Sequence, residues 1–371
     1  MKKDICVIVG TRPGIIMMAP IVHELKKRDC NYFVIHSGQH YSPEMDAELF
    51  EDLELGKPDF RLKGVAHATS HGTKTARMLE GFEDVFMRRR PHVVIVNGDA
   101  NTNVAAALAA RKLHIPLAHS EAGERSYDWR MPEEHNRRIM DNISDLLFPT
   151  DQKAADILEN EYVPGQVLIT GNTIVDATLK HAEMARKASN VLNEYSLQKD
   201  NYLLLTTHRE ENVDTRERLL AILLGTNAGA EALGLTAAFP IHPRTLKNVK
   251  NFSLHDTLLG LSNIKILPPL RYLDFTDILV NARLIVTDSG GVQQEAFIQR
   301  RHCVTVRDGT EWTETVTRKG NRIAGADDIE RIKTAIVDAY NEKEAEWTQA
   351  FGDGKAAKRI VDHVLAFQAS Y

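Results

Sequence analysis

The sequence predicts an α/β protein made of two similar, Rossmann-like, doubly wound halves that face each other across a cleft. Short apolar runs alternate with amphipathic helical patterns along almost all of the chain, which is typical of parallel sheets covered on both faces. The chain of 371 residues is longer than the chains that usually fold around a single hydrophobic core. The alternation also restarts after Gly171-Asn172-Thr173, where a strand ends in a glycine turn. We therefore expect two domains, with ligands at the carboxyl ends of the strands.

The first domain is expected over residues 1–172. Its β-branched and apolar runs predict strands at 5–9, 32–36, 93–96, 117–119 and 167–169. Segments with helical spacing of apolar residues predict helices at 19–27, 42–53, 72–90, 103–113, 132–147 and 151–161.

The second domain is expected over residues 173–354. Apolar runs predict its strands at 202–206, 237–241, 264–267 and 284–287. Amphipathic patterns predict helices at 176–195, 216–228, 272–281 and 331–340. A last helical segment, 355–371, is expected to pack back on the first domain.

Composition excludes several classes of function. The 46 basic and 51 acidic residues give a net charge of −5, which does not favour nucleic acid or an anionic membrane surface as a partner. No stretch approaches the about 20 apolar residues needed to span a bilayer. The three cysteines are widely separated and lack metal-ligand spacing, so we expect reduced thiols and a cytoplasmic protein.

The most informative segment is Thr287-Asp288-Ser289-Gly290-Gly291, which joins a strand to a helix. Glycines allow a ligand to approach the backbone, and the free N–H groups of a first helical turn bind phosphate. Glu295, one turn later, could accept hydrogen bonds from ribose hydroxyls. This pattern indicates a nucleoside diphosphate site, although a plain strand-to-helix turn has the same form.

Three carboxylates are expected at strand ends or first helical turns of the first domain, namely Asp99, Glu121 and Glu133. Each alone could be a helix cap or a favourable charge in a first turn. Together, a cluster of acids beside a cleft can separate their pKa values and supply both an acid and a base. We therefore interpret the three as catalytic.

Cations also follow predicted strands. Arg12 comes after the first strand and could hold a phosphate in a bidentate fork. His208 and Arg209 follow the first strand of the second domain, and His242 follows the next, although a lone histidine there is more often structural. No Cys/His cluster reads as a metal site, and Gly10–Gly14 is not a dinucleotide fingerprint.

These motifs resemble the UDP-N-acetylglucosamine 2-epimerase family, whose fold is the two-domain GT-B fold. The resemblance covers nearly the whole chain, and the order of its motifs is more specific than any one of them. The motifs are Gly10-Thr11-Arg12-Pro13, Gln39-His40, Gly98-Asp99, Glu121-Ala122-Gly123, Pro132-Glu133-Glu134-His135-Asn136-Arg137, Gly171-Asn172-Thr173, His208-Arg209-Glu210-Glu211-Asn212, Thr287-Asp288-Ser289-Gly290-Gly291, Thr310-Glu311-Trp312 and Gly352-Asp353-Gly354.

The resemblance implies an enzyme that inverts C2 of a UDP-linked N-acetylhexosamine without NAD or metal, by eliminating UDP to a 2-acetamidoglucal and adding it back. It implies a homodimer and no cofactor. It assigns acid/base roles to Asp99, Glu121 and Glu133, and places His208 near the departing diphosphate. It assigns nucleotide binding to Arg12, Arg209, Ser289, Gly290, Gly291 and Glu295. It assigns sugar or regulatory contacts to Gln39, His40, Arg137, His242 and Arg307.

The sequence departs from the family pattern in places. Gly14 and Met17 stand where members usually carry Glu and Lys, which indicates an altered site at that turn. Thr310-Glu311-Trp312 is also similar to relatives that act on UDP-diacetamido-uronic acids. A hydrolysing epimerase that releases N-acetylmannosamine and UDP, a GT-B glycosyltransferase and a weakly active nucleotide-sugar binding protein remain the alternatives.

Overall fold

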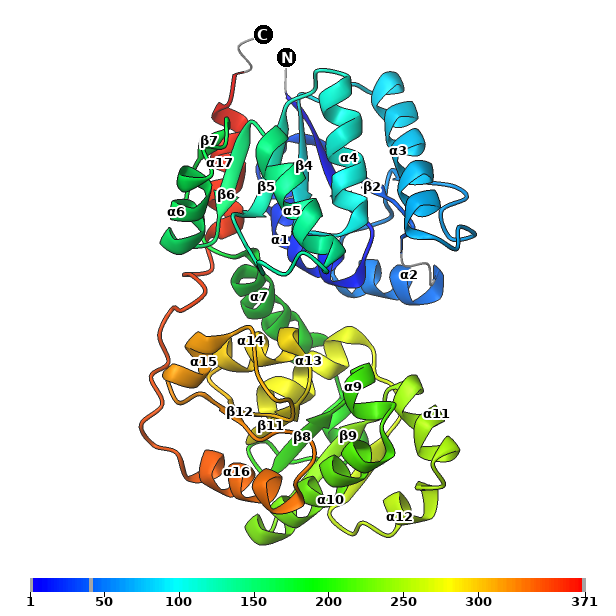
Figure 1. The fold of residues 1–371 in the computed structure, drawn as a ribbon, viewed down its shortest axis with the longest axis vertical. Coiled ribbons are helices and arrows are strands. Elements are labelled where there is room, and N and C mark those ends of the chain that lie inside the picture. Colours follow the sequence, from blue (N-terminus) through cyan, green and yellow to red (C-terminus); the bar gives the residue numbers. More distant parts are fainter. Residues whose placement is uncertain (1–2, 40–42, 369–371) are drawn as a thin grey trace. The chain divides into compact units, whose positions relative to one another are not determined.

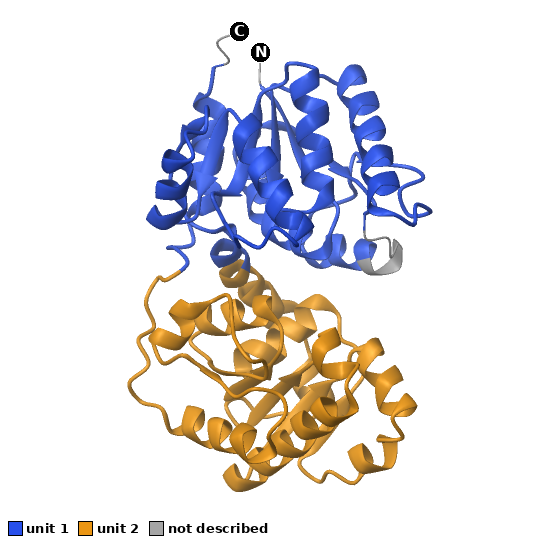
Figure 2. Ribbon diagram, viewed as in Figure 1, with its two compact units in different colours: residues 1–177, 351–371 blue, residues 178–350 orange. Residues whose placement is uncertain are grey.

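The chain folds into two compact units (Figure 2). The computed structural model describes residues 3–39 and 43–368. Unit 1 contains residues 1–177 and 351–371, and unit 2 contains residues 178–350. The chain passes into unit 2 within helix α7 (Thr173–Ala188) and returns after residue 350. The first boundary, expected after residue 172, thus lies after Ala177, and the second, expected after residue 354, lies before Phe351. The C-terminal helix is part of unit 1.

Unit 1 is built on a parallel sheet. Among the described residues it has seven strands in the order β3-β2-β1-β4-β5-β6-β7. The strands are β1 (Asp4–Val9), β2 (Asn31–His36), β3 (Phe60–Arg61), β4 (Val93–Asn97), β5 (Leu117–Ala122), β6 (Leu146–Pro149) and β7 (Gln166–Val167). The central position of β1, β4 and β5 brings the polar residues that follow them to one edge of the sheet.

Helices cover both faces of this sheet (Figure 1). On one face, Cys6 and Ile8 of β1 share an apolar core with Phe82 and Ala106 from neighbouring helices. On the other face, the first helix packs against β1 and against the C-terminal helix. The helices of unit 1 are α1 (Arg12–Lys27), α2 (Pro43–Asp52), α3 (His71–Arg88), α4 (Asn101–Lys112), α5 (Pro132–Ile143), α6 (Gln152–Asn160) and α17 (Ala356–Ala366).

One predicted element of unit 1 is wrong at its end. The helix expected over 132–147 stops at Ile143, because Ser144 is extended and the apolar run that follows pairs with β5 as strand β6. Periodicity does not separate a short buried strand from the last turn of a helix, so tertiary pairing decides between them.

Unit 2 repeats the parallel architecture. Its described residues form six strands in the order β10-β9-β8-β11-β12-β13. The strands are β8 (Tyr202–Thr206), β9 (Thr236–Pro240), β10 (Ile264–Leu267), β11 (Leu284–Thr287), β12 (His302–Thr305) and β13 (Asn321–Ile323). The helices are α8 (Val191–Glu194), α9 (Glu210–Val213), α10 (Arg216–Leu233), α11 (Pro243–Asn251), α12 (His255–Leu259), α13 (Tyr272–Asn281), α14 (Gly290–Ile298), α15 (Thr313–Thr317) and α16 (Ile329–Asn341).

The closest helix pair of unit 2 depends on two glycines. A Cβ added at Gly225 or Gly229 of α10 would lie 2.8 Å from Ile332 or Ile336 of α16, respectively. Real Cβ atoms do not approach so closely, so glycine lets the two helix backbones pack together over the core.

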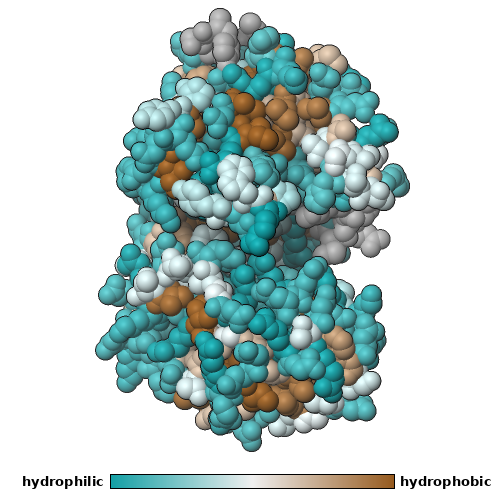
Figure 3. Space-filling view, viewed as in Figure 1, coloured by the Kyte–Doolittle hydropathy of each residue, from teal (hydrophilic) through white to brown (hydrophobic). Residues whose placement is uncertain are grey.

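The face in Figure 3 is mostly hydrophilic, with smaller apolar areas. Over residues 3–39 and 43–368, no helix combines the length and the apolar character that crossing a bilayer requires.

Candidate functional site

The carboxyl ends of three neighbouring strands carry two of the predicted acids of unit 1 and the predicted Arg12. Strand β4 pairs with β1 on one side and with β5 on the other. Asp99 follows β4, Glu121 lies at the end of β5, and the exposed Arg12 begins α1 directly after β1. The sheet therefore brings these three positions to one edge, as the sequence predicted.

Glu121 has a backbone conformation that side chains rarely adopt. Its φ is +64°, and the pairing of β5 with β6 shifts register between Ser120 and Ala122. Such an irregularity turns a side chain away from the regular alternation of a strand. In the resulting position Asn97 Nδ2 donates to Glu121 Oε2 over 3.1 Å, and Asn172 Nδ2 donates to Oε1 over 3.0 Å. Both carboxylate oxygens are therefore held by neutral amides.

The surroundings of Glu121 shift its proton affinity strongly. Burial, with further contributions from the like charges of Glu124 and Asp99, raises the pKa of Glu121 to about 7. The hydrogen bond from Asn172 and the neighbouring His119 act in the opposite direction. A carboxyl group with this pKa can both accept and release a proton near neutral pH, which is the requirement for general acid–base catalysis.

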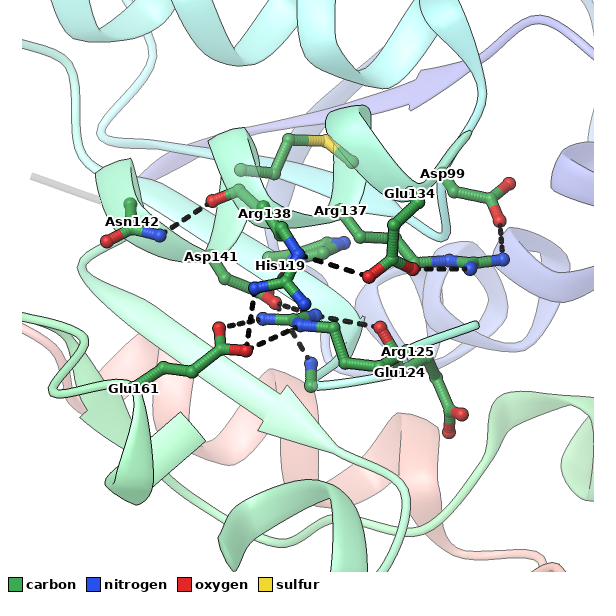
Figure 4. A network of polar contacts seen from close by, with 12 residues as sticks. Asp99, His119, Glu124, Arg125, Glu134, Arg137, Arg138, Asp141, Asn142 and Glu161 are labelled. Atoms are coloured by element: carbon green, nitrogen blue, oxygen red, sulfur yellow. Dashed lines mark hydrogen bonds and ion pairs between the residues drawn. The ribbon is translucent and has the colours of Figure 1, made fainter. Parts of the chain in front are cut away.

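Asp99 belongs to a network of ion pairs that runs along α5 (Figure 4). Arg137 Nη2 pairs with Asp99 Oδ2 at 2.5 Å, and Arg137 Nη1 lies 3.3 Å from Glu134 Oε2. Glu134 is buried and also accepts from Arg138 Nε and from the backbone and hydroxyl of Ser126. Burial alone would raise the pKa of Glu134, but the hydrogen bonds from Ser126 and then Arg138 hold it below its ordinary value. Glu134 is thus an anion that fixes two arginines.

Glu133 lies beside Glu134 in the first turn of α5 and is only partly buried. Within the described part of the chain its side chain has no hydrogen bond or ion pair, unlike that of its neighbour. The catalytic role of Glu133 stays a prediction.

A second part of the network is centred on Asp141 of α5 and fixes the segment that follows Glu121. The buried Asp141 accepts from Gly123 N at 3.2 Å, and lies 2.8 Å from His119 Nδ1 and 2.7 Å from Arg125 Nη1. Arg125 also pairs with Glu161, at 2.7 Å. The other nitrogen of His119 lies 3.0 Å from the carbonyl oxygen of Gly98, so the carboxyl ends of β4 and β5 are connected through His119 to Asp141 of α5.

Two further predicted residues of unit 1 differ in environment. Gln39 Oε1 accepts from both the backbone N–H and the hydroxyl of Thr102, each at 2.7 Å, so this oxygen caps helix α4. Arg137 pairs with Asp99 and Glu134 in the network described above. His40 lies outside the described residues.

In unit 2 the loop after β8 is organised by Asp288, which is fully buried. Its carboxylate accepts from the backbone N–H groups of His208 and Arg209 at about 3.0 Å and from the hydroxyl of Thr207 at 2.6 Å. Asn212 Nδ2 donates to it as well, at 3.2 Å. These bonds attach the loop that carries His208 and Arg209 to the end of β11.

The predicted phosphate turn begins helix α14. Ser289 caps the helix by accepting from Val292 N at 3.5 Å. A Cβ at Gly290 would lie 3.2 Å from Trp312 Nε1, 3.6 Å from Glu311 Oε2 and 3.9 Å from Arg209 Nη2. Among described residues nothing lies within 4 Å of one at Gly291. The turn therefore has an open backbone at Gly291 and the guanidinium of Arg209 beside it, which suits an anion.

The remaining predicted residues of unit 2 lie near this turn or its neighbours. The rings of His208 and His242 are 5.4 Å apart, and His208 Nδ1 lies 3.5 Å from Asp288 Oδ1. Arg307 pairs with Glu211 and Glu311, both at 3.0 Å. Glu295 lies in α14 and is partly buried.

The predicted site residues thus form two groups, one in each unit. Sequence reasoning missed the residues that support them. Asp288 and Asn172 stood inside recognised motifs, but their roles depend on partners 80 and 51 residues away along the chain. Asn97 directly follows the predicted strand 93–96 but was assigned no role, and Asp141 carried no sequence signal. Across the described residues, no group of three His, Cys, Asp or Glu side chains could hold a metal ion.

Comparisons with known proteins agree with these motifs. Residues 23–365 match the family model described as UDP-N-acetylglucosamine 2-epimerase. The chain is 44% identical to the UDP-N-acetylglucosamine 2-epimerase of Methanocaldococcus jannaschii, covering 96% of this chain and 97% of the other. It is 35% identical to the UDP-2,3-diacetamido-2,3-dideoxy-D-glucuronate 2-epimerase of Pseudomonas aeruginosa, covering 97% and 99%.

Solved structures show the same relationship. The crystal structure of the M. jannaschii UDP-GlcNAc 2-epimerase in complex with UDP-GlcNAc and UDP superposes with a TM-score of 0.83 at 43% identity, covering 98% of this chain and 100% of the other. The predicted fold class, two Rossmann-like domains of the GT-B type, is confirmed by this similarity and by the two parallel sheets.

Proposed function

The chain belongs to the UDP-N-acetylglucosamine 2-epimerase family, and from this membership we propose that it converts UDP-N-acetylglucosamine to UDP-N-acetylmannosamine by eliminating UDP and adding it back. The observation that carries the mechanism is Glu121, a carboxyl group with a pKa of about 7 at the edge of the unit 1 sheet. Such a group suits a reaction that removes a proton from C2 and returns one to it.

The elimination needs two changes in the sugar. The bond between C1 and the diphosphate oxygen breaks with its electrons leaving on UDP, and C2 loses its proton to form the C1–C2 double bond of a 2-acetamidoglucal. Positive charge develops at C1 in this step, and nearby carboxylates stabilise it. The return step protonates C2 on the opposite face while UDP attacks C1 again.

Inversion needs proton carriers for both faces of C2, and we assign them to Glu121, Asp99 and Glu133. Glu121 exchanges its proton near neutral pH. Asp99 is fixed by its ion pair with Arg137, and Glu133 projects from the adjacent first turn of α5. This division among the three carboxylates is part of the proposal.

We assign UDP to unit 2. The diphosphate is proposed to bind the turn of Ser289, Gly290 and Gly291, where the open backbone and Arg209 favour an anion. Glu295, one turn into α14, is proposed to accept from the ribose hydroxyls. His208 is proposed to assist the departing diphosphate, and Arg12 of unit 1 is proposed to contact the nucleotide.

The reaction is tested by incubating the purified protein with UDP-N-acetylglucosamine in D2O and following the sugar by NMR. We expect UDP-N-acetylmannosamine with deuterium at C2. Glu121→Gln should lower turnover by about 10²–10⁴-fold, because it removes a proton carrier, while leaving UDP affinity nearly unchanged. The matched control is Glu159→Gln, the same substitution at an exposed position of α6. Full activity of Glu121→Gln would contradict the assignment.

The nucleotide site is tested without turnover. Ser289→Ala and Glu295→Ala should weaken UDP binding measured by calorimetry, whereas Glu121→Gln should not. If both unit 2 variants bound UDP as tightly as the original protein, the diphosphate would have to bind elsewhere.

A second substrate is favoured by Thr310-Glu311-Trp312 and by the P. aeruginosa relative named for a UDP-diacetamido-glucuronate. Comparing kcat/KM for the two UDP-sugars separates these candidates. The same NMR experiment detects a hydrolysing enzyme, because free N-acetylmannosamine and UDP would accumulate.

A homodimer and a cytoplasmic location complete the proposal. The mass of the purified protein by light scattering tests the first: twice the chain mass of 41.6 kDa is expected. Cell fractionation tests the second.

A further inference from the structure

Asn172 connects Glu121 to two other segments of unit 1. Its Nδ2 donates to Glu121 Oε1 over 3.0 Å, and its Oδ1 accepts from Ile174 N over 2.9 Å at the start of α7. Its own backbone N–H donates to the carbonyl oxygen of Phe351 over 3.2 Å. The residue is 5% exposed, so these bonds are shielded from water.

The two segments that Asn172 joins are the places where the chain leaves and re-enters unit 1. They are fastened to each other by further contacts. Asp176 of α7 accepts from the N–H groups of Ala356 and Ala357 at 3.1 and 3.0 Å, which caps α17. Arg359 Nη1 donates to the carbonyl oxygen of Thr170 at 3.0 Å.

The backbones of these segments approach closely at two glycines. A Cβ added at Gly352, whose φ is +118°, would lie 3.4 Å from Gly171 Cα and 3.5 Å from Asn172 N. At these distances an added methyl group makes ordinary van der Waals contact, so a larger residue at Gly352 acts through the φ of +118°, which L side chains rarely adopt. Relief of that strain moves the backbone that lies next to Asn172 N.

We propose that Asn172 is a positioning residue that couples the carboxyl group of Glu121 to both segments through which the chain passes between its two units. The proposal rests on the acid–base role assigned to Glu121. A shift of either segment moves the amide of Asn172, and with it the hydrogen bond that favours the ionised carboxylate. Movement of the connections thus changes how readily Glu121 takes up a proton.

Other charged groups also affect the pKa of Glu121, so their charges must stay the same in a test. Asp99 follows β4, Glu124 follows β5, and His119 lies on β5 itself. None of them contacts Asn172 through a described hydrogen bond, so substitutions at Asn172 leave their charges in place.

The test measures the proton affinity of Glu121 directly, by NMR titration of ¹³C-carboxyl-labelled glutamates. The Glu121 signal is identified by its loss in Glu121→Gln. Asn172→Ala removes the donor and should raise the pKa of Glu121 by about one unit. Asn172→Asp keeps an acceptor for Ile174 N but adds a negative charge, so it should raise the pKa further. An unchanged pKa in both variants would overturn the positioning role.

The coupling is tested at Gly352, which does not touch Glu121 through any described contact. Gly352→Ala should raise the pKa of Glu121 in the same direction as Asn172→Ala. The control is Gly64→Ala, another positive-φ glycine of unit 1 (φ +77°), with nothing described within 4 Å of an added Cβ. If Gly352→Ala left the pKa unchanged, or if Gly64→Ala moved it equally, the coupling would be refuted.

This titration is independent of turnover. Activity retained by Glu121→Gln would refute the proposed function while the pKa shifts could still be present. Loss of activity in Glu121→Gln together with unchanged pKa values in the Asn172 variants would refute only the inference.

Discussion

Replacing Asp141 with asparagine removes the charge at the centre of the unit 1 network. The side chains of Asp141, His119 and Arg125 are all fully buried. In the variant the guanidinium of Arg125 would keep its ion pair with Glu161 and its hydrogen bond to the carbonyl oxygen of Glu124 but lose the charge of Asp141, and His119 would face a neutral amide. The N–H of Gly123, which fixes the segment after Glu121, would lose its charged acceptor.

The expected cost follows from burial. Removing one partner of a buried ion pair destabilises a protein by about 3–5 kcal/mol, because the other charge stays buried without compensation. The matched control is Asp362→Asn, which breaks the pair with Arg28 at a side chain that is 45% exposed. An exposed pair contributes only about 0–1 kcal/mol.

Hydrogen exchange resolved by peptide is the appropriate assay, since a chain of two units need not unfold in one step. The opening free energy of β5 and α5 should fall by about 3–5 kcal/mol in Asp141→Asn, and by less than about 1 kcal/mol in the control. Equal, small effects in both variants would refute the view that this network fixes the Glu121 segment.

The same variant has a defined pH dependence. Burial alone would raise the pKa of Asp141, but the hydrogen bond and charge of His119, and then Arg125, hold the pKa below its ordinary value. A carboxyl with a depressed pKa contributes stability above its ordinary pKa, and that contribution is lost as the pH falls through the folded-state value. The difference in stability between the original protein and Asp141→Asn should therefore shrink in acid.

Three further predictions concern single positions. Met17 Sδ lies 3.7 Å from Asn97 Nδ2, so Met17→Lys should place a cation near Glu121 and lower its pKa below about 7 in the carboxyl titration; an unchanged or higher value would contradict this. Gly10→Ala would bring a Cβ to 2.3 Å from Thr102 Oγ1, and should destabilise unit 1 by about 1–3 kcal/mol in thermal unfolding. An unchanged stability would mean that the side chains of Ser37 and Thr102 move aside without cost. Asp288→Asn should loosen the loop after β8 and weaken UDP binding about tenfold by calorimetry; unaltered affinity would remove Asp288 from the support of the nucleotide site.

The edge of the unit 1 sheet to which we assign the acid–base residues was only partly predictable. Asp99 and Glu121 could be found because residues after buried strands gather at one edge of a parallel sheet. Glu133 and Glu134 are adjacent in the same helical turn, and their sequence positions do not show which one is buried. The structure makes Glu134 the partner of two arginines and leaves Glu133 outside the network.

The proposed nucleotide site had a stronger local signal. A strand, a glycine turn and a helix start within a few residues, so Ser289 and Gly290 could be assigned from the sequence. Arg209 was also assigned to the nucleotide from the family resemblance, but its position beside Gly290 and the support from Asp288 were not predictable, because they join loops that lie about 80 residues apart.

Periodicity and the turn at Gly171 were sufficient to predict two parallel α/β units, since each pattern depends on residues a few positions apart. The pKa of Glu121 required the folded chain, because it depends on burial and on Asp99, Glu124 and Asn172 at separate positions. The same holds for the link from Asn172 to Phe351, which spans almost half the sequence. Local spacing encodes elements, whereas electrostatic environment and coupling arise from contacts that only tertiary packing creates.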